Sequence, residues 1–327
     1  MKGEKKMTID EQITAEVLRT IARDEQIKES VLRSSSLYPL LLAAAKRYVT
    51  GETRQEVQSR AKELEEKGYR LSVEYIGENT LDAKACEQVK DEFLAVIDDC
   101  SVLQRPVGVS FDLSHVGLLV SQEQAFAHVE EMAVAAARNQ HDVMISMEES
   151  TKTEAIMAMY ERLAQRHENV GITIQAHLHR SVEDVQRVLA LPGKIRLVKG
   201  AFKEPRDIAL ARSAELNERY LQLAEMCVKA GHTCAFATHD QLIVDELQKR
   251  DYFSHPEVEL ELLYGVRPEL AQSMQQNGIP VRLYLTYGKE WYLYLCHRIA
   301  EYPPNIHKAI ADMFDPTRTA HVGYGEK

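Results

Sequence analysis

Short hydrophobic runs rich in β-branched and aromatic residues recur along most of the chain, separated by longer amphipathic segments. Runs of this length predict strands, and the amphipathic segments between them predict helices. Strands that alternate with helices indicate parallel β/α units. The predicted strands lie at residues 70–77, 106–113, 142–149, 171–178, 194–201, 232–240, 257–265 and 280–288.

The number of predicted strands favours an α/β fold, a (β/α)8 barrel of the TIM type. The alternative is a doubly wound open sheet, but no GxGxxG turn follows any predicted strand. Ahead of the first strand, apolar periodicity predicts helices near residues 9–33, 38–48 and 53–67. We therefore expect a helical N-terminal extension over residues 1–68 and a catalytic barrel over residues 69–327.

Charge and cysteine content narrow the classes of function. The formal net charge of −10 argues against a nucleic-acid partner, because binding to phosphates requires a basic surface. The five cysteines form no C-x-x-C pair, a pattern typical of reduced cytosolic thiols rather than of disulfides or a zinc site. The sequence has no signal segment, and no apolar stretch approaches the ~18 residues of a membrane span. We expect a cytoplasmic protein, with peripheral contact to a membrane left open.

A barrel directs attention to the carboxyl ends of its strands, where catalytic groups gather. Polar side chains that enter a barrel mouth cost free energy unless they pair or bind something, so a ligand site is expected there. The polar residues at these ends are Glu74, Glu78, Asp112, Ser146, Glu148, Glu149, Gln175, His177, Arg196, Lys199, Thr238, His239, Asp240, Glu261 and Tyr287.

Several of these residues allow two interpretations. Arg196 and Lys199 suit an anionic ligand or salt bridges with rim acids, and the sequence does not favour either. Glu261 is a functional acid or the partner of one of these cations, and pairing is the safer assumption.

The histidines at the mouth raise the possibility of a metal. His177 and His179, with Asp112, His239 and Asp240, could bind a metal in a barrel hydrolase. No two of these histidines have the helical i,i+4 spacing, so we favour the reading in which one histidine faces the mouth and the other caps a loop.

The segment after the last strand predicts a helix that carries unusual chemistry. Tyr294, His297, Arg298 and Glu301 recur at i, i+3, i+4 and i+7, and Trp291 lies one turn earlier. An exposed amphipathic helix would turn Arg and Glu to solvent. Aromatic residues share their face, which is typical of a helix that leans over a binding site.

Several ordered motifs resemble the proline dehydrogenase family, FAD-dependent barrel enzymes that oxidise L-proline to Δ1-pyrroline-5-carboxylate. The resemblance covers roughly residues 48–310. It rests on YVTGET, EYIGE, IQAHLHR, RLVKGAFKE, ATHD, ELLYGVRPEL and VRLYLTYGKEWYLYLCHRIAEYPPN.

The resemblance implies a flavin over the barrel mouth, a substrate pocket beside it, and transfer of electrons to quinone or another acceptor. Hydride would pass to flavin N5, and a nearby cation would stabilise the charge that develops. The matching cofactor positions are Gln175, Arg196, Val198, Lys199, Gly200, Ala201, Phe202, Thr238 and His239. The matching substrate positions are Arg298, Glu301, Tyr287 and Leu263.

This chain departs from the family pattern at five pocket positions. Asp112 stands in place of lysine, Ser146 of aspartate, Phe202 of tyrosine, Glu261 of glutamine and His297 of arginine. By formal count, these changes make the site about three charges more negative. Loss of one charged contact typically weakens binding by ~2–5 kcal/mol.

We therefore expect a flavoenzyme whose substrate is proline or a relative that is less anionic, more cationic or carrier-bound. His297 or Asp112 is a candidate to assist deprotonation of the amine. Two alternatives remain: the metal-dependent hydrolase, and a flavin-binding protein that has lost catalysis.

Overall fold

Eight parallel strands close into a barrel in a computed structural model that describes residues 8–320 and 322–325. Each strand pairs with the next along the chain, and β8 pairs with β1, so the predicted barrel is confirmed and the open sheet is excluded. The strands are β1 (Arg70–Tyr75), β2 (Val107–Phe111), β3 (Asp142–Ile145), β4 (Val170–Gln175), β5 (Ile195–Val198), β6 (Cys234–Ala237), β7 (Val258–Leu263) and β8 (Val281–Tyr287).

Helices follow the strands and also precede the barrel. The helices before β1 are α1 (Ile9–Ala22), α2 (Glu25–Arg33), α3 (Leu37–Ala45) and α4 (Arg54–Glu66). Those between strands are α5 (Ala83–Asp99), α6 (Gln122–Arg138), α7 (Thr153–Ala164), α8 (Ser181–Val188), α9 (Ala214–Lys229), α10 (Gln241–Lys249) and α11 (Pro268–Gln276). The chain ends with α12 (Trp291–Glu301), α13 (Asn305–Phe314) and α14 (Thr317–Ala320), and short 3-10 turns lie at Cys100–Val102, Ser150–Lys152 and Tyr252–Ser254.

The predicted boundaries differ from the observed ones in two informative ways. Most predicted strands extend several residues past the observed carboxyl end, because the apolar pattern continues into the loops of the mouth. The single helix predicted over residues 9–33 is two helices. Asp24 divides them, since its side chain accepts hydrogen bonds from the N–H groups of Gln26 (2.9 Å) and Ile27 (3.0 Å) and caps α2.

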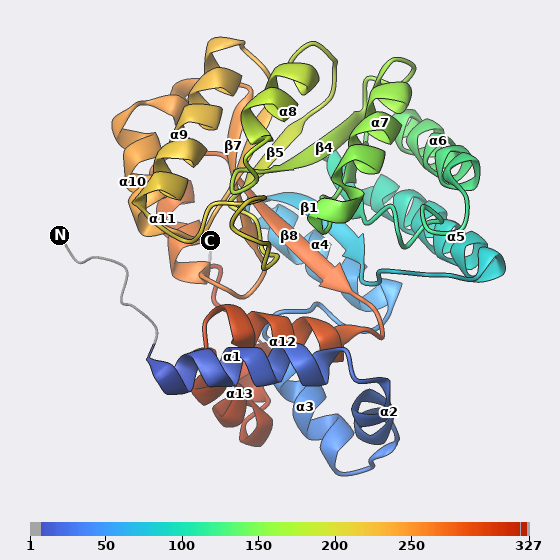
Figure 1. The fold of residues 1–327 in the computed structure, drawn as a ribbon. Helices are drawn as coiled ribbons and strands as arrows, with labels where there is room; N and C mark the ends of the chain where they lie inside the picture. Colours follow the sequence, from blue (N-terminus) through green and yellow to red (C-terminus); the bar gives the residue numbers. More distant parts are fainter. Residues whose placement is uncertain (1–7, 321, 326–327) are drawn as a thin grey trace.

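Helices α4 and α12 do not lie where their order in the chain suggests. Helix α4 packs on the outside of the barrel against β1 and β8, where the helix after β8 would lie in a simple barrel. Helix α12 instead packs against α1 and α3. The arrowhead of β8 points towards α12, which lies beside α1 beyond the carboxyl end of that strand (Figure 1).

The barrel interior contains buried charge as well as apolar side chains. Near the amino ends of the strands, Glu259 is 1% exposed and binds Arg282 (2.6 Å) and Lys194 (2.9 Å). Burial raises the pKa of a carboxyl group, but these two cations hold the pKa of Glu259 below its ordinary value. Each of these charged groups thus has a partner of opposite sign.

Two further observations concern the whole fold. All five cysteines are buried and free. In the part of the chain that the structure describes, no helix is long and apolar enough to cross a bilayer.

Candidate active site

Arg196 lies at the centre of the barrel mouth. It projects inward from β5, and its Nε and Nη2 atoms bind the two carboxylate oxygens of Glu261 at 2.8 and 2.9 Å. Nη2 also donates to Ser110 Oγ (2.8 Å), and the guanidinium lies 4.7 Å from the ring centroid of Tyr284. Ser72 donates to the same carboxylate (2.9 Å). This bidentate pair fixes the orientation of Arg196 and confirms Glu261 as its partner.

The other cations of the rim are also paired. Lys199 forms an ion pair with Asp240. Lys152 binds Glu148 (2.6 Å) and Glu149 (2.9 Å). The salt-bridge interpretation of Arg196 and Lys199 is therefore confirmed, with Glu261 and Asp240 rather than Glu148 as the partners.

Buried polar atoms without partners lie at the carboxyl ends of β4 and β6. His239 Nε2 accepts a hydrogen bond from the N–H of Leu263 (3.1 Å), so Nδ1 carries the proton, and that buried atom has no partner among the described residues. Burial, with Arg298 and Arg267 adding to it, lowers the pKa of His239 to about 3. A neutral histidine thus presents an unused N–H donor, which a bound group could satisfy.

His177 has a similar arrangement next to a constrained glycine. Its Nδ1 lies 2.9 Å from the carbonyl oxygen of Lys199, and its buried Nε2 has no partner among the described residues. Gly200 has a φ of +108°, and a Cβ there would meet the His177 ring at 1.5 Å. Only glycine lets the backbone pass this close to the ring.

The two histidines of IQAHLHR do not come together on a metal. His179 Nε2 lies 2.9 Å from the carbonyl oxygen of Arg206, on a loop, while His177 is buried at the mouth. Over residues 8–320 and 322–325, no group of three or more His, Cys, Asp or Glu side chains is placed to hold a metal ion. The metal hypothesis gains no support from this geometry.

Helix α12 carries Arg298 with one nitrogen unused. Arg298 Nη2 binds Glu301 Oε1 (2.5 Å), and the guanidinium lies 4.9 Å from the ring centroid of Tyr294. The Nε of Arg298 and the hydroxyl of Tyr294 are buried and have no partner among the described residues. Burial, with the nearby charges of Arg298, Arg23 and Arg19, lowers the pKa of His297 to about 4. At neutral pH, His297 is therefore uncharged, and Arg298 is the one cation of this pair.

Two further carboxyl groups, Glu74 and Asp112, lie near other charged groups of the mouth. Burial raises the pKa of Glu74 to about 7, although Tyr284, Arg196 and Arg298 act to lower it. Burial and the charges of Glu148, Glu74 and Glu78 raise the pKa of Asp112 well above its ordinary value. The side chain of Asp112 thus lies among acids.

Tyr287 does not lie at the mouth. Its hydroxyl donates to Glu92 of α5 (2.8 Å), and its ring packs 5.3 Å from that of Tyr75, outside the barrel. Tyr284 lies on the inward face of the same strand, against Arg196. The sequence reasoning missed Tyr284, although alternation from Arg282, which reaches Glu259 in the interior, would have found it.

The remaining predicted residues follow the strand ends. Ser146 comes directly after β3 and donates its N–H to the Phe111 carbonyl (2.9 Å). Thr238 Oγ1 accepts the Asp240 N–H (3.1 Å). Gln175 Nε2 donates to the Glu148 carbonyl (2.8 Å). Val198 ends β5, Leu263 ends β7, and Ala201 and Phe202 begin the loop before α9.

Helix α1 reaches the same mouth from outside. Arg23, which follows α1, lies 3.4 Å from Glu149 and 3.8 Å from Glu78, and Glu16 lies 3.3 Å from Lys203. Helix α1 and the residue that follows it thus cover part of the rim, in addition to α12.

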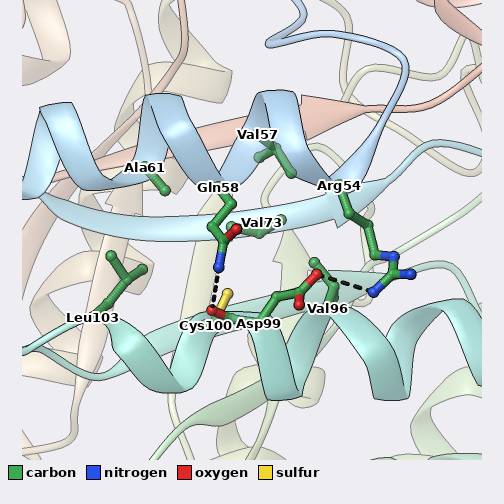
Figure 2. A pocket seen from close by; sticks show the side chains of 9 residues that line it. All are labelled: Arg54, Val57, Gln58, Ala61, Val73, Val96, Asp99, Cys100 and Leu103. Carbon is green, nitrogen blue, oxygen red and sulfur yellow. Dashed lines mark hydrogen bonds and ion pairs between the residues drawn. The ribbon is translucent and has the colours of Figure 1, made fainter.

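Two cavities lie away from the mouth. A gap of about 10 Å³ lies between α4 and α5. Figure 2 shows the side chains that line it, among them Gln58 and Arg54, which bind Asp99. It has room for about one water molecule. A groove of about 780 Å³ lies along α3 and α4, and its charged groups pair with one another, as Arg60 does with Glu63 (2.5 Å). Neither cavity contains a predicted site residue.

Comparison with known proteins places this geometry among relatives. A family model described as proline dehydrogenase matches residues 57–305. Proline dehydrogenase 1 of Bacillus subtilis is 31% identical over 266 residues, which cover 80% of this chain and 87% of the relative. Proline dehydrogenase of Deinococcus radiodurans is 28% identical over 304 residues, which cover 90% of this chain and 96% of the relative.

Solved structures give the same fold. Proline utilization A from Bdellovibrio bacteriovorus superposes with a TM-score of 0.74 at 18% identity. The match covers 92% of this chain and 38% of that larger protein.

Proposed function

Because the chain belongs to the proline dehydrogenase family, we propose that it is an FAD-dependent enzyme that oxidises the C–N bond of L-proline or of a proline-like cyclic amine. It is an oxidoreductase by this membership. The product of proline itself would be Δ1-pyrroline-5-carboxylate. The proposal is carried by Arg298, whose buried Nε lacks a partner beside the ring of Tyr294.

Arg298 is suited to hold the carboxyl group of such a substrate. Its Nη2 is committed to Glu301, which orients the guanidinium, and its Nε remains as a donor. A buried donor without a partner costs about 1–3 kcal/mol, so a ligand oxygen placed there gains that free energy. Glu301 and Tyr294 therefore position Arg298, and Arg298 binds.

The residues at the ends of β4 to β6 fit a flavin. The unused N–H of His239, the buried Nε2 of His177 and the close backbone approach at Gly200 support a bound group on this side of the mouth. The residues proposed to hold it are Gln175, Arg196, Val198, Lys199, Gly200, Ala201, Phe202, Thr238 and His239. When bound, the flavin would accept the hydride.

Proton transfer falls to the carboxylates. The ring nitrogen must lose its proton before the C–N bond can be oxidised, and a base with a pKa near the working pH is effective. Glu74, with a pKa of about 7, and Asp112, whose pKa is also raised, have this property. His297 is neutral at pH 7 and can accept a proton only weakly. Tyr287 has no part in this proposal, because it lies outside the barrel.

The partners follow from the chemistry. The substrate is a small amine or imino acid, and the electrons pass to quinone or another acceptor, which would require contact with a membrane surface if the quinone is lipid-bound. A cytoplasmic location is part of the same proposal.

The test is a flavin spectrum of the purified protein, followed by anaerobic titration with L-proline and with cyclic amines related to it. A yellow protein that bleaches with at least one of these compounds supports the proposal. A colourless protein that binds no added FAD would overturn it, and so would a yellow protein that none of them reduces, which fits the inactive flavin-binding alternative.

A matched pair of variants locates the substrate. In Arg298→Ala, bleaching of the flavin by the amine should be reduced more than tenfold, while the absorbance of the oxidised flavin is retained. Arg162→Ala, which removes an exposed arginine paired with Glu123 on the outer helices, should behave as the parent protein does.

A further inference from the structure

Two carboxylates at the barrel mouth have no cation of their own. Among the described residues, Glu74 and Asp112 form no ion pair. Both are close enough to other charged groups of the mouth for those charges to affect their pKa. The rim cations are directed elsewhere: Arg196 to Glu261, Lys199 to Asp240, Arg298 to Glu301, and Lys152 to Glu148 and Glu149. Arg23 approaches Glu78 (3.8 Å) but is half exposed. The mouth therefore holds more carboxyl groups than its cations can pair with.

This excess of carboxyl groups opposes an anion and favours a cation, whose charge lets a carboxyl group ionise. Asp112 is electrostatically close to Glu74, Glu78 and Glu148, so each ionised group raises the cost of the next. A ligand with a positive group near Asp112 relieves that repulsion. A ligand with a free carboxylate adds to it, because like charges brought together at a binding site cost several kcal/mol.

Arg298 provides a second, independent observation. Its charge is already matched by Glu301, and its buried Nε has no partner among the described residues, in a guanidinium that lies 4.9 Å from the ring centroid of Tyr294. A neutral carbonyl oxygen is enough to satisfy this N–H. A carboxylate gains most from a bidentate fork, and Nη2, which would form that fork together with Nε, already binds Glu301.

Resting on the proposed function, we infer that the mouth selects proline-like cyclic amines whose carboxyl group is blocked as an amide, so that the substrate enters with a net positive charge. The amide carbonyl binds Arg298 Nε, and the ring ammonium lies towards Asp112 and Glu74. Oxidation removes one proton from the ring nitrogen, to a carboxylate, and one hydride from the adjacent ring carbon, to the flavin. The C–N bond becomes C=N, and the amide bond stays intact.

Binding without turnover tests this directly. The purified protein is reduced chemically, so that no amine can be oxidised, and titrated by calorimetry at pH 7 with L-prolinamide and with L-proline. The parent protein should bind the amide about tenfold or more tightly, which corresponds to about 1.4 kcal/mol or more. Equal affinities, or tighter binding of L-proline, would overturn the inference.

Charge variants then assign the preference to Asp112. Asp112→Asn should reduce the preference, and Asp112→Lys should reverse it towards L-proline. The matched control is Glu66→Lys, the same change of charge at an exposed residue that ends α4, close to the start of β1 and so at the opposite end of the barrel. Circular dichroism checks folding, and if Asp112→Lys does not fold, Asp112→Asn alone decides. An unchanged preference in the folded variant overturns the role of Asp112.

The outcomes separate this inference from the proposed function. If the oxidised protein is bleached by L-proline and binds it better than L-prolinamide, only the inference fails. If the protein holds no flavin, or neither compound bleaches it and neither binds, both fail. Bleaching by L-prolinamide with weak binding of L-proline supports both.

Discussion

Glu74 offers a direct measure of the electrostatic strain at the mouth. Burial raises its pKa from an ordinary value of 4.5 to about 7, and the charge of Glu78 adds to the increase. Replacing Glu74 with Gln removes the charge and keeps a side chain of the same shape that can still contact Tyr284. The variant Glu74→Gln should therefore gain stability over the parent protein as the pH rises.

The sign and size follow from proton linkage. Between pH 4.5 and 7, the folded protein keeps a proton on Glu74 that the unfolded chain releases, so the free energy of unfolding of the parent falls as the pH rises. Each pKa unit is worth about 1.4 kcal/mol. The displacement of Glu74 thus corresponds to at most about 3.5 kcal/mol, absent below pH 4.5 and fully present above pH 7.

Urea titration of the parent and of Glu74→Gln at pH 5, 6, 7 and 8 measures this. The variant should be near the parent at pH 5 and more stable by about 2–3 kcal/mol at pH 8. The exposed Glu66→Gln variant should show a difference that does not change with pH. A flat difference for Glu74→Gln, or a variant less stable than the parent at pH 8, would show that Glu74 is not strained in the folded protein.

Four other substitutions test the remaining assignments. Arg298→Lys keeps a charge but loses the Nε donor, so kcat/KM for the best amine should fall roughly 30-fold or more. Tyr284→Phe should change the kinetics of flavin reduction, because Tyr284 packs against Arg196 at the mouth. Tyr287→Phe should leave KM unchanged and lower the free energy of unfolding, measured in urea, by about 1 kcal/mol, because it removes only a hydrogen bond outside the barrel. Asp312→Ala should lower the free energy of unfolding by about 3 kcal/mol or more in the same assay, because the partly buried Arg47 loses its carboxylate partner. A decrease below about 1 kcal/mol would contradict this.

The architecture could be predicted because its signal is repeated and local. Each strand of the barrel is a short apolar run bounded by polar loops, and eight such runs with helices between them leave few alternatives. The same signal does not locate carboxyl ends well. Residues 146–149 keep an apolar-polar pattern but already form the loop that carries Glu148 into contact with Lys152.

For the candidate site, the residue types could be predicted from the sequence better than the directions of the side chains. The reading that Glu261 pairs with a rim cation needed only alternation along β7, which is local. Tyr287 was placed at the mouth by its position at a strand end, but the side-chain direction depends on parity, and one residue of difference moved it to the outer face. Nothing in the sequence shows that α12 packs on α1 and α3, since this depends on α4 filling the outer groove.

The formal charge count from sequence also treats unlike residues as equal. Glu261 adds a negative charge, but both its oxygens bind Arg196, so the mouth feels a neutral pair. Asp112 adds a carboxyl group that forms no ion pair among the described residues, and burial and the neighbouring acids raise its pKa. A substitution at Glu261 should therefore act through the orientation of Arg196, and so on the flavin side, while a substitution at Asp112 should act on the charge of the preferred ligand. Two acids that are equivalent in a count are therefore expected to affect different steps.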